Sequence, residues 1–262
     1  MRILLFACIA CGSAVAGLQA AADLPPKQVI TGDVSTDSAS VSLLERQPWA
    51  GGPWYYGWGL QSDVYSFGTI PGLEIRRLQD VAAQLTLQYF IKAEEVAAVT
   101  LMPGLYFENH PDSSCWDIPI DLETAIPIAK VFNGVIGFSN ARFYHHALPI
   151  IGFVWDISPR FRLEAVYPEP ALVITLRKEL ELRLAGQLIG GGFETDARPL
   201  RTRVEYYAYR VGMNLCYEMG HGLKLSAGGG NEVQREFDFY QAGQRIHAKP
   251  EPYAAIEVEW SR

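Results

Sequence analysis

Histidine and serine are the residue types in this chain that hydrolysis would need. A hydrolase acting on lipid activates a hydroxyl with an adjacent histidine, and His221 and Ser226 form one pair close in the sequence. They lie five positions apart, so on a single strand they would point to opposite faces. No Gly-x-Ser-x-Gly motif occurs. The sequence therefore predicts no enzyme, and an outer-membrane lipid hydrolase is kept as a second alternative.

The other groups with chemical potential predict neither a metal site nor a cofactor. His145-His146 and the pair His110 and Asp112 fall in expected loops, where solvated histidines are the simpler interpretation. The glycine runs 190–192 and 228–230 lack the Lys-Ser/Thr of a phosphate-binding loop, so we interpret them as strand ends, bulges or close backbone approaches. We predict no catalytic, cofactor-binding or metal-ligating residues.

The N-terminus has the pattern of a secretory signal peptide. A charge at Arg2 precedes the apolar run 3–10, and small residues lead to Ala20-Ala21-Ala22. We predict that residues 1–22 are a signal peptide, which places the mature protein beyond the inner membrane of a Gram-negative cell. Cleavage leaves Cys115 and Cys216, and the sequence does not decide whether they form a disulfide.

Alternation with period two is the strongest structural pattern. In residues 180–188 the apolar side chains Leu180, Leu182, Leu184 and Leu188 alternate with polar ones. Successive side chains of a strand point to opposite faces, so this pattern is typical of a wall with lipid outside and water inside. The predicted lumen-lining residues on the polar face are Arg162, Glu164, Glu181, Arg183, Arg210, Lys224, Glu257 and Glu259.

The same pattern, bounded by turn residues, predicts an all-β fold: an antiparallel up-and-down transmembrane β-barrel of about 12 strands. The expected strands are Gly57 to Phe67, Ala82 to Lys92, Val96 to Phe107, Leu122 to Phe132, Val135 to Phe143, Pro149 to Ile157, Phe161 to Tyr167, Pro170 to Lys178, Leu180 to Gly190, Thr202 to Tyr217, Gly222 to Glu236 and Pro250 to Trp260. Short and long connections mostly alternate between them, as is typical of outer-membrane barrels, and the short connection Pro168-Glu169 is the exception.

Aromatic residues gather where the first expected strand begins. We predict an interfacial girdle, as membrane proteins place aromatic side chains at the headgroup level; a carbohydrate-stacking platform is the alternative. The candidate girdle residues are Trp49, Trp54, Tyr55, Tyr56, Trp58, Tyr207, Tyr217 and Trp260. Residues 23–47 are rich in Ser, Thr and Asp. We predict a periplasmic or inward-folded segment over residues 23–56, with the barrel in 57–262.

Composition restricts the partners. The net charge of −7 and the dispersed Lys and Arg residues argue against nucleic acid. Beyond the signal peptide, no stretch approaches the ~20 apolar residues that a spanning helix needs. We expect outer-membrane lipid and the barrel-insertion machinery as partners, and the sequence does not identify a small-molecule ligand.

Several motifs carry a resemblance to a known family. They are residues 148–152 with Trp155 and Pro159, then 161–163 and 167–170, then 228–239, and finally Pro252-Tyr253. In these the chain resembles an uncharacterised outer-membrane β-barrel family of Gram-negative bacteria, a domain of unknown function. The resemblance covers the C-terminal half clearly and implies no catalytic residues. The predicted function is a non-enzymatic outer-membrane barrel with a structural, passive-transport or ligand-binding role. The first alternative is a secreted soluble β-protein that binds an apolar ligand.

Overall fold

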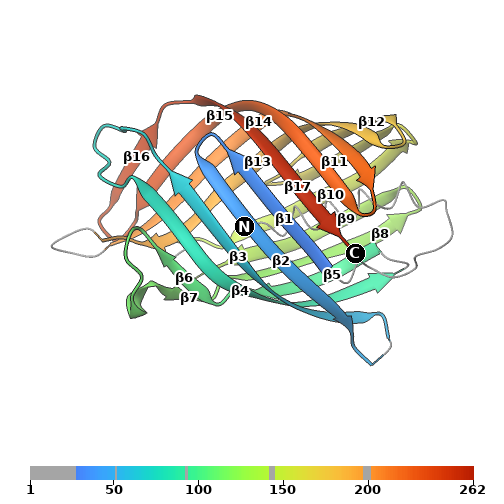
Figure 1. Cartoon of the computed structure of the whole chain (residues 1–262), viewed down its shortest axis with the longest axis horizontal. Coiled ribbons are helices and arrows are strands. Elements are labelled where there is room, and N and C mark those ends of the chain that lie inside the picture. The colour runs from blue at the N-terminus through green and yellow to red at the C-terminus, as the bar shows by residue number, and fades with distance from the viewer. Residues whose placement is uncertain (1–27, 51, 92–93, 142–144, 197–201) are drawn as a thin grey trace.

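The chain folds into a closed antiparallel β-barrel (Figure 1). The computed structural model describes residues 28–50, 52–91, 94–141, 145–196 and 202–262. Within these residues fourteen strands form the wall, and the last pairs with the first. They are β1 (Gln28–Ser35), β2 (Ser38–Pro48), β3 (Trp54–Ser66), β4 (Arg77–Ile91), β5 (Glu94–Leu101), β8 (Ile120–Ala129), β9 (Phe132–Asn140), β10 (Leu148–Ser158), β11 (Phe161–Tyr167), β12 (Ala171–Arg177), β13 (Leu180–Glu194), β14 (Arg203–Gly220), β15 (Leu223–Phe239) and β17 (Glu251–Ser261).

The first two strands correct the prediction for the N-terminal segment. β1 pairs with β17 from Val29↔Ser261 to Ser35↔Ala255, and β2 pairs along its whole length with β3. The inward face of β2 begins with Ser38, Ser40 and Ser42. Serine-rich segments are typical of loops, so the composition alone led to the wrong prediction although the residues alternate as in a strand. Each of the twelve expected strands matches a strand of the wall. The two additional strands, β1 and β2, raise the number to fourteen. Residues 1–22 and 23–27 lie outside the described residues.

Connections divide the barrel into a turn end and a loop end. At the turn end two residues join β8 to β9 and two join β14 to β15. Both ends of the described wall also meet there, where Gln28 and Arg262 exchange two backbone hydrogen bonds of 2.9 Å. Longer segments join β3 to β4, β5 to β8 and β15 to β17 at the opposite, loop end. In outer-membrane barrels the short turns face the periplasm, so the loop end corresponds to the outer side.

One expected strand divides into two. The range 96–107 contains β5 and then β6 (Gly104–Phe107), separated by Met102 and Pro103. Proline cannot donate a ladder hydrogen bond. Both halves pair with β4, but on the other side β5 pairs with β8, whereas β6 pairs with β7. The short elements η1 (Ser113–Cys115), β7 (Trp116–Asp117) and β16 (Gln244–Ala248) complete this end, and Figure 1 shows β6, β7 and β16 gathered on its left.

The two faces of the wall have opposite character. Large apolar side chains are exposed on the outer face, for example Leu60 on β3, Ile136 on β9 and Ile256 on β17. Polar and charged side chains, such as Gln84 and Arg162, are buried on the inner face. The part of the chain that the structure describes contains no helix that is long and apolar enough to cross a membrane. A soluble protein would bury the apolar face, so this inside-out distribution contradicts the soluble alternative.

Candidate functional site in the lumen

The inner face of the wall carries the residues predicted to line the lumen. On β11, Arg162 and Glu164 are buried and alternate with outward Phe161 and Leu163. On β14, Arg210 is 2% exposed beside outward Val211. The other candidates also occupy inward positions of their strands, Glu259 buried and Glu181, Arg183, Lys224 and Glu257 half-buried.

Three of these residues form one ion-pair group. Arg162 Nε lies 3.0 Å from Glu164 Oε1, and Arg183 Nη2 lies 2.6 Å from Glu164 Oε2. Both arginines therefore neutralise one carboxylate that is 1% exposed. The group crosses from β11 to β13, past β12, so it stiffens this part of the wall.

A second group, which we call the arginine network, comprises Asp37, Arg210, Glu232, Arg235 and Glu251. Arg210 Nε lies 2.8 Å from Glu232 Oε1 and also pairs with Asp37 in the β1–β2 turn. Arg235 lies 3.0 Å from Glu232 and 2.5 Å from Glu251. The Arg210 guanidinium stacks 4.8 Å from the centre of the Tyr253 ring. The network joins β14, β15 and β17 to the turn, and sequence reasoning found only Arg210.

The opposite part of the lumen is acidic. Its inward carboxylates, the acidic sector, are Asp63 on β3, Asp80 on β4, Asp117 on β7, and Asp121 and Glu123 on β8, all less than 10% exposed. Asp63 and Asp80 are cross-strand partners, and Asp121 stands opposite Thr100 on one side and Ser139 on the other. The sequence contains a pattern that indicates two of these inward positions, because Asp121 and Glu123 alternate with Ile120 and Leu122. The expected strands began too late, at Ala82 and Leu122, to include Asp80 and Asp121.

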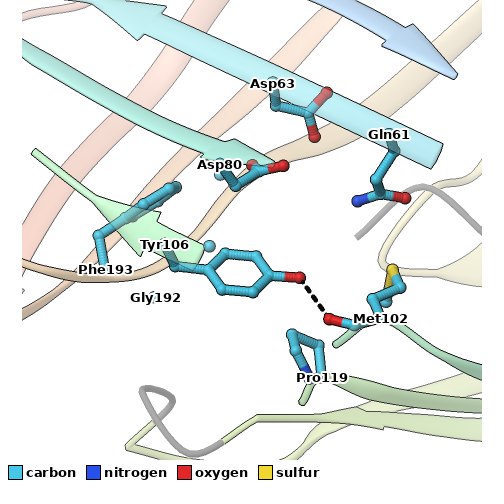
Figure 2. Close-up of a pocket in the computed structure, with 10 residues that line it drawn as sticks. Gln61, Asp63, Asp80, Met102, Tyr106, Pro119, Gly192 and Phe193 are labelled. Carbon is cyan, nitrogen blue, oxygen red and sulfur yellow. Dashed lines mark hydrogen bonds between the residues drawn. The ribbon is translucent and has the colours of Figure 1, made fainter. Parts of the chain in front are cut away.

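A small pocket lies within this sector. It is lined by Gln61, Asp63, Asp80, Tyr106 and Phe193, among others, and Figure 2 shows these side chains around one space. The Tyr106 hydroxyl donates a 2.8 Å hydrogen bond to the Met102 carbonyl. Burial, with smaller contributions from Asp80 and Asp117, raises the Tyr106 pKa far above its ordinary value. Tyr106 is therefore a neutral wall of the pocket.

An apolar cluster closes the loop end of the lumen. The β3–β4 connection, residues 67–76, is here called the plug loop, and its side chains Phe67, Ile70, Leu73 and Ile75 are buried. They pack with inward residues of the far wall, including Phe193, Val204, Tyr206 and Phe237. Aromatic rings meet directly across the lumen: the ring centre of Tyr65 on β3 lies 5.4 Å from that of Tyr206, and the ring centre of Phe67 in the plug loop lies 4.9 Å from that of Phe237. At the turn end, by contrast, inward Asn133 and Asn214 are half-buried and Pro127 is exposed.

The candidate girdle residues mostly face outward. Trp49, Trp54, Tyr56, Trp58 and Tyr217 are exposed, and Tyr207 and Trp260 are half-buried. Tyr55 is a correction: it is 7% exposed and packs inside against Phe90, with ring centres 5.2 Å apart. Period two explains the error, because Tyr55 lies between outward Trp54 and Tyr56.

The groups considered for chemistry are not brought together. His221 lies in the β14–β15 turn, whereas Ser226 is buried on the inner face. His110 lies 3.1 Å from Asp196, while Asp112 accepts from the Ser114 amide; His145 stacks on His146. Cys115 and Cys216 are both buried, free thiols. Among the described residues, no group of three or more His, Cys, Asp or Glu side chains is placed to hold a metal ion.

A closed wall, an apolar outer face and a polar lumen together define an outer-membrane β-barrel. No protein-family model matches the chain, so membership of the uncharacterised family stays a prediction. No curated protein matches it either.

Solved outer-membrane barrels resemble the chain in overall architecture. One is the KdgM porin in complex with disordered oligogalacturonate, at 10% identity and a TM-score of 0.36, over 90% of this chain and 98% of that one. Another is the NanC porin, at 13% identity and a TM-score of 0.38, over 89% of this chain and 98% of that one. A third is the COG4313 outer membrane channel from Pseudomonas putida F1, at 12% identity and a TM-score of 0.48, over 91% of this chain and 97% of that one.

Proposed function

We propose that the barrel is a non-enzymatic, passive pathway for small polar solutes across the outer membrane, restricted at its loop end by the plug loop. The observation that carries the proposal is the change of character along the lumen. Charged and amide side chains line the wall up to the level of Gln61 and Asp80, and an apolar cluster around Phe67 and Tyr206 lies beyond it. A purely structural barrel has no need of a polar lining beneath an apolar closure.

Export and insertion are part of the same proposal. Residues 1–22 direct the chain across the inner membrane and are then removed, which the charge at Arg2 and the small residues 20–22 support. The barrel-insertion machinery and outer-membrane lipid are the partners that such a wall needs. Mass spectrometry of the purified protein tests the first step, because the proposal requires a mature N-terminus at Asp23.

Ion conductance in planar bilayers tests the transport role. We expect low or infrequent conductance for the mature protein and a marked increase for the variant Ile70→Asn/Leu73→Asn, because two buried contacts of the plug loop become polar. Thr69→Asn/Glu74→Gln is the matched control, since both side chains are exposed on the same loop. A heat-modifiability gel verifies that each variant is folded. Equal, negligible conductance of folded wild type and plug variant would refute the pathway.

A further inference from the structure

Basic side chains gather along one part of the turn end of the barrel. They are Lys130 in the β8–β9 turn, Arg160 in the β10–β11 turn, and Arg177 and Lys178 where β12 leads into β13. All four are exposed, and their hairpins end on the right of Figure 1. We call these four side chains the basic rim. Glu179 is the only carboxylate in the three turns, all of which the structure describes, so this edge has a net charge of +3.

The charges of the basic rim are available to a partner. Within the described part of the chain, none of the four side chains forms an ion pair with a carboxylate, whereas Arg162 and Arg210 inside the lumen do. A cation at the surface that is not paired within the protein attracts anions from its surroundings.

Backbone hydrogen bonds join the three turns into one continuous edge. The Asp156 amide donates to the Val131 carbonyl, and the Thr175 amide donates to the Arg160 carbonyl, both at 2.9 Å. Each turn is thereby tied to the next strand of the wall. The strands therefore set the spacing of the basic side chains, which is about 10 Å between neighbouring hairpins.

Apolar side chains beside the basic rim indicate its depth in the membrane. Ile128, Ile157 and Leu176 are exposed on the outer face, one to three residues from Lys130, Arg160 and Arg177 respectively. A strand advances about 3.3 Å per residue, so the basic groups lie within about 10 Å of side chains that meet hydrocarbon. The headgroup layer on each side of a bilayer is about 5–8 Å thick. The basic rim is therefore at the level of the lipid headgroups.

The opposite part of the turn end has a different chemistry. The described residues of the β2–β3 turn carry no charge, and Trp49, Trp54 and Tyr56 are exposed around it. Aromatic rings lie at the headgroup level because they are amphipathic. Lys and Arg instead lay their apolar stems along the wall and place a charge among the phosphates. Each Lys or Arg near an anionic surface favours binding about fivefold.

We infer that the basic rim binds anionic phospholipids, with its Lys and Arg side chains contacting the headgroup phosphates of the periplasmic leaflet. These lipids collect along β8 to β13, and the aromatic side of the barrel has no such preference. The polymer of the cell wall is another anionic partner on the periplasmic side, but the position of the rim directly beside lipid-facing side chains favours lipid. The inference requires that the barrel spans the membrane, and it is independent of whether the lumen conducts.

Quenching of a lipid-facing fluorophore tests the inference. Bimane is attached to Ile157→Cys in a Cys115→Ser/Cys216→Ser background, and the folded protein is reconstituted into phosphatidylcholine vesicles that contain brominated phosphatidylglycerol or brominated phosphatidylcholine. We expect phosphatidylglycerol to associate at least about fivefold more strongly beside the label. Lys130→Gln/Arg160→Gln removes the two charges flanking the label and should bring this preference close to unity.

Two controls locate the effect. Arg77→Gln/Lys249→Gln removes two exposed basic side chains at the loop end and should leave the preference unchanged. A label at Tyr56→Cys, on the aromatic side, should show no preference. A heat-modifiability gel verifies that each variant is folded.

Equal quenching by the two lipids at Ile157→Cys, or a preference that persists in Lys130→Gln/Arg160→Gln, would overturn the inference. A preference lost equally in the loop-end control would also overturn it, because net charge alone would then be responsible. In 1 M KCl, where the Debye length is about 3 Å, the preference should decrease, and insensitivity to salt would contradict recognition by charge. Equal quenching together with retention on purified peptidoglycan that depends on Lys130 and Arg160 would replace lipid by the cell wall as the partner.

Discussion

Substitution of Ile256 by arginine tests which face of the wall meets lipid. Ile256 lies midway along β17 and is 57% exposed, beside outward Val34 on β1. Little protein packing is lost at such a position, so the cost is mainly that of placing a guanidinium in hydrocarbon. Near the centre of a bilayer that cost is about 2–4 kcal/mol, or roughly a hundredfold in the folding equilibrium at the middle of this range.

Ala255→Arg is the matched control, one residue away on the opposite face. Ala255 is half-buried and faces the lumen next to inward Glu257 and Asp33, which are themselves cross-strand partners. An arginine there gains two carboxylate neighbours, so we expect a stability change below about 1 kcal/mol. The assay is urea titration of folding into vesicles, followed by tryptophan fluorescence and by band shift on unboiled gels. Equal effects of the two substitutions, or a larger one for Ala255→Arg, would refute the assignment of the faces.

Three further predictions concern the interior. Arg210→Met leaves Glu232 and Asp37 without this cation and should destabilise the barrel by about 3–5 kcal/mol in the same titration; combining it with Glu232→Gln should cost less than the sum of the two. Phe237→Ala removes a fully buried ring from the loop-end cluster and should cost about 3–5 kcal/mol while increasing bilayer conductance; unchanged conductance of the folded variant would argue against occlusion by this cluster. Burial raises the pKa of the Cys115 thiol, so in a Cys216→Ser background maleimide labelling at pH 8 should be much slower in the folded protein than in urea.

Local alternation was enough to predict the wall, but not where the wall begins. Residues 207–217 assign Arg210 inward and Val211 outward without any knowledge of neighbours, because the pleat alone fixes the face. β1 and β2 have the same period with small hydroxyl side chains, and their composition resembles a loop. Their role becomes evident only through pairing with β17 and β3.

The contacts in the lumen depend on the register between paired strands, and the sequence alone does not determine that register. Glu232 meets Arg210 because β15 pairs with β14 through a bulge at this level, and Asp37 reaches the same arginine from a turn 173 positions away. The loop-end cluster is harder still, because Tyr65 and Tyr206 come from walls that face each other across the lumen. Side chains that meet across a lumen leave no periodic pattern in either strand.

The pairing of β1 with β17 has a consequence for how the molecule folds. Thr36 and Ala254 are hydrogen-bonded although 218 positions separate them, and the whole seam has similar separations. Contacts this distant require nearly all of the chain to be ordered first, so ring closure is expected to be late and slow. Until then both seam strands expose unpaired backbone groups that favour aggregation. A soluble escort that holds the chain before insertion would therefore protect these two strands more than any others.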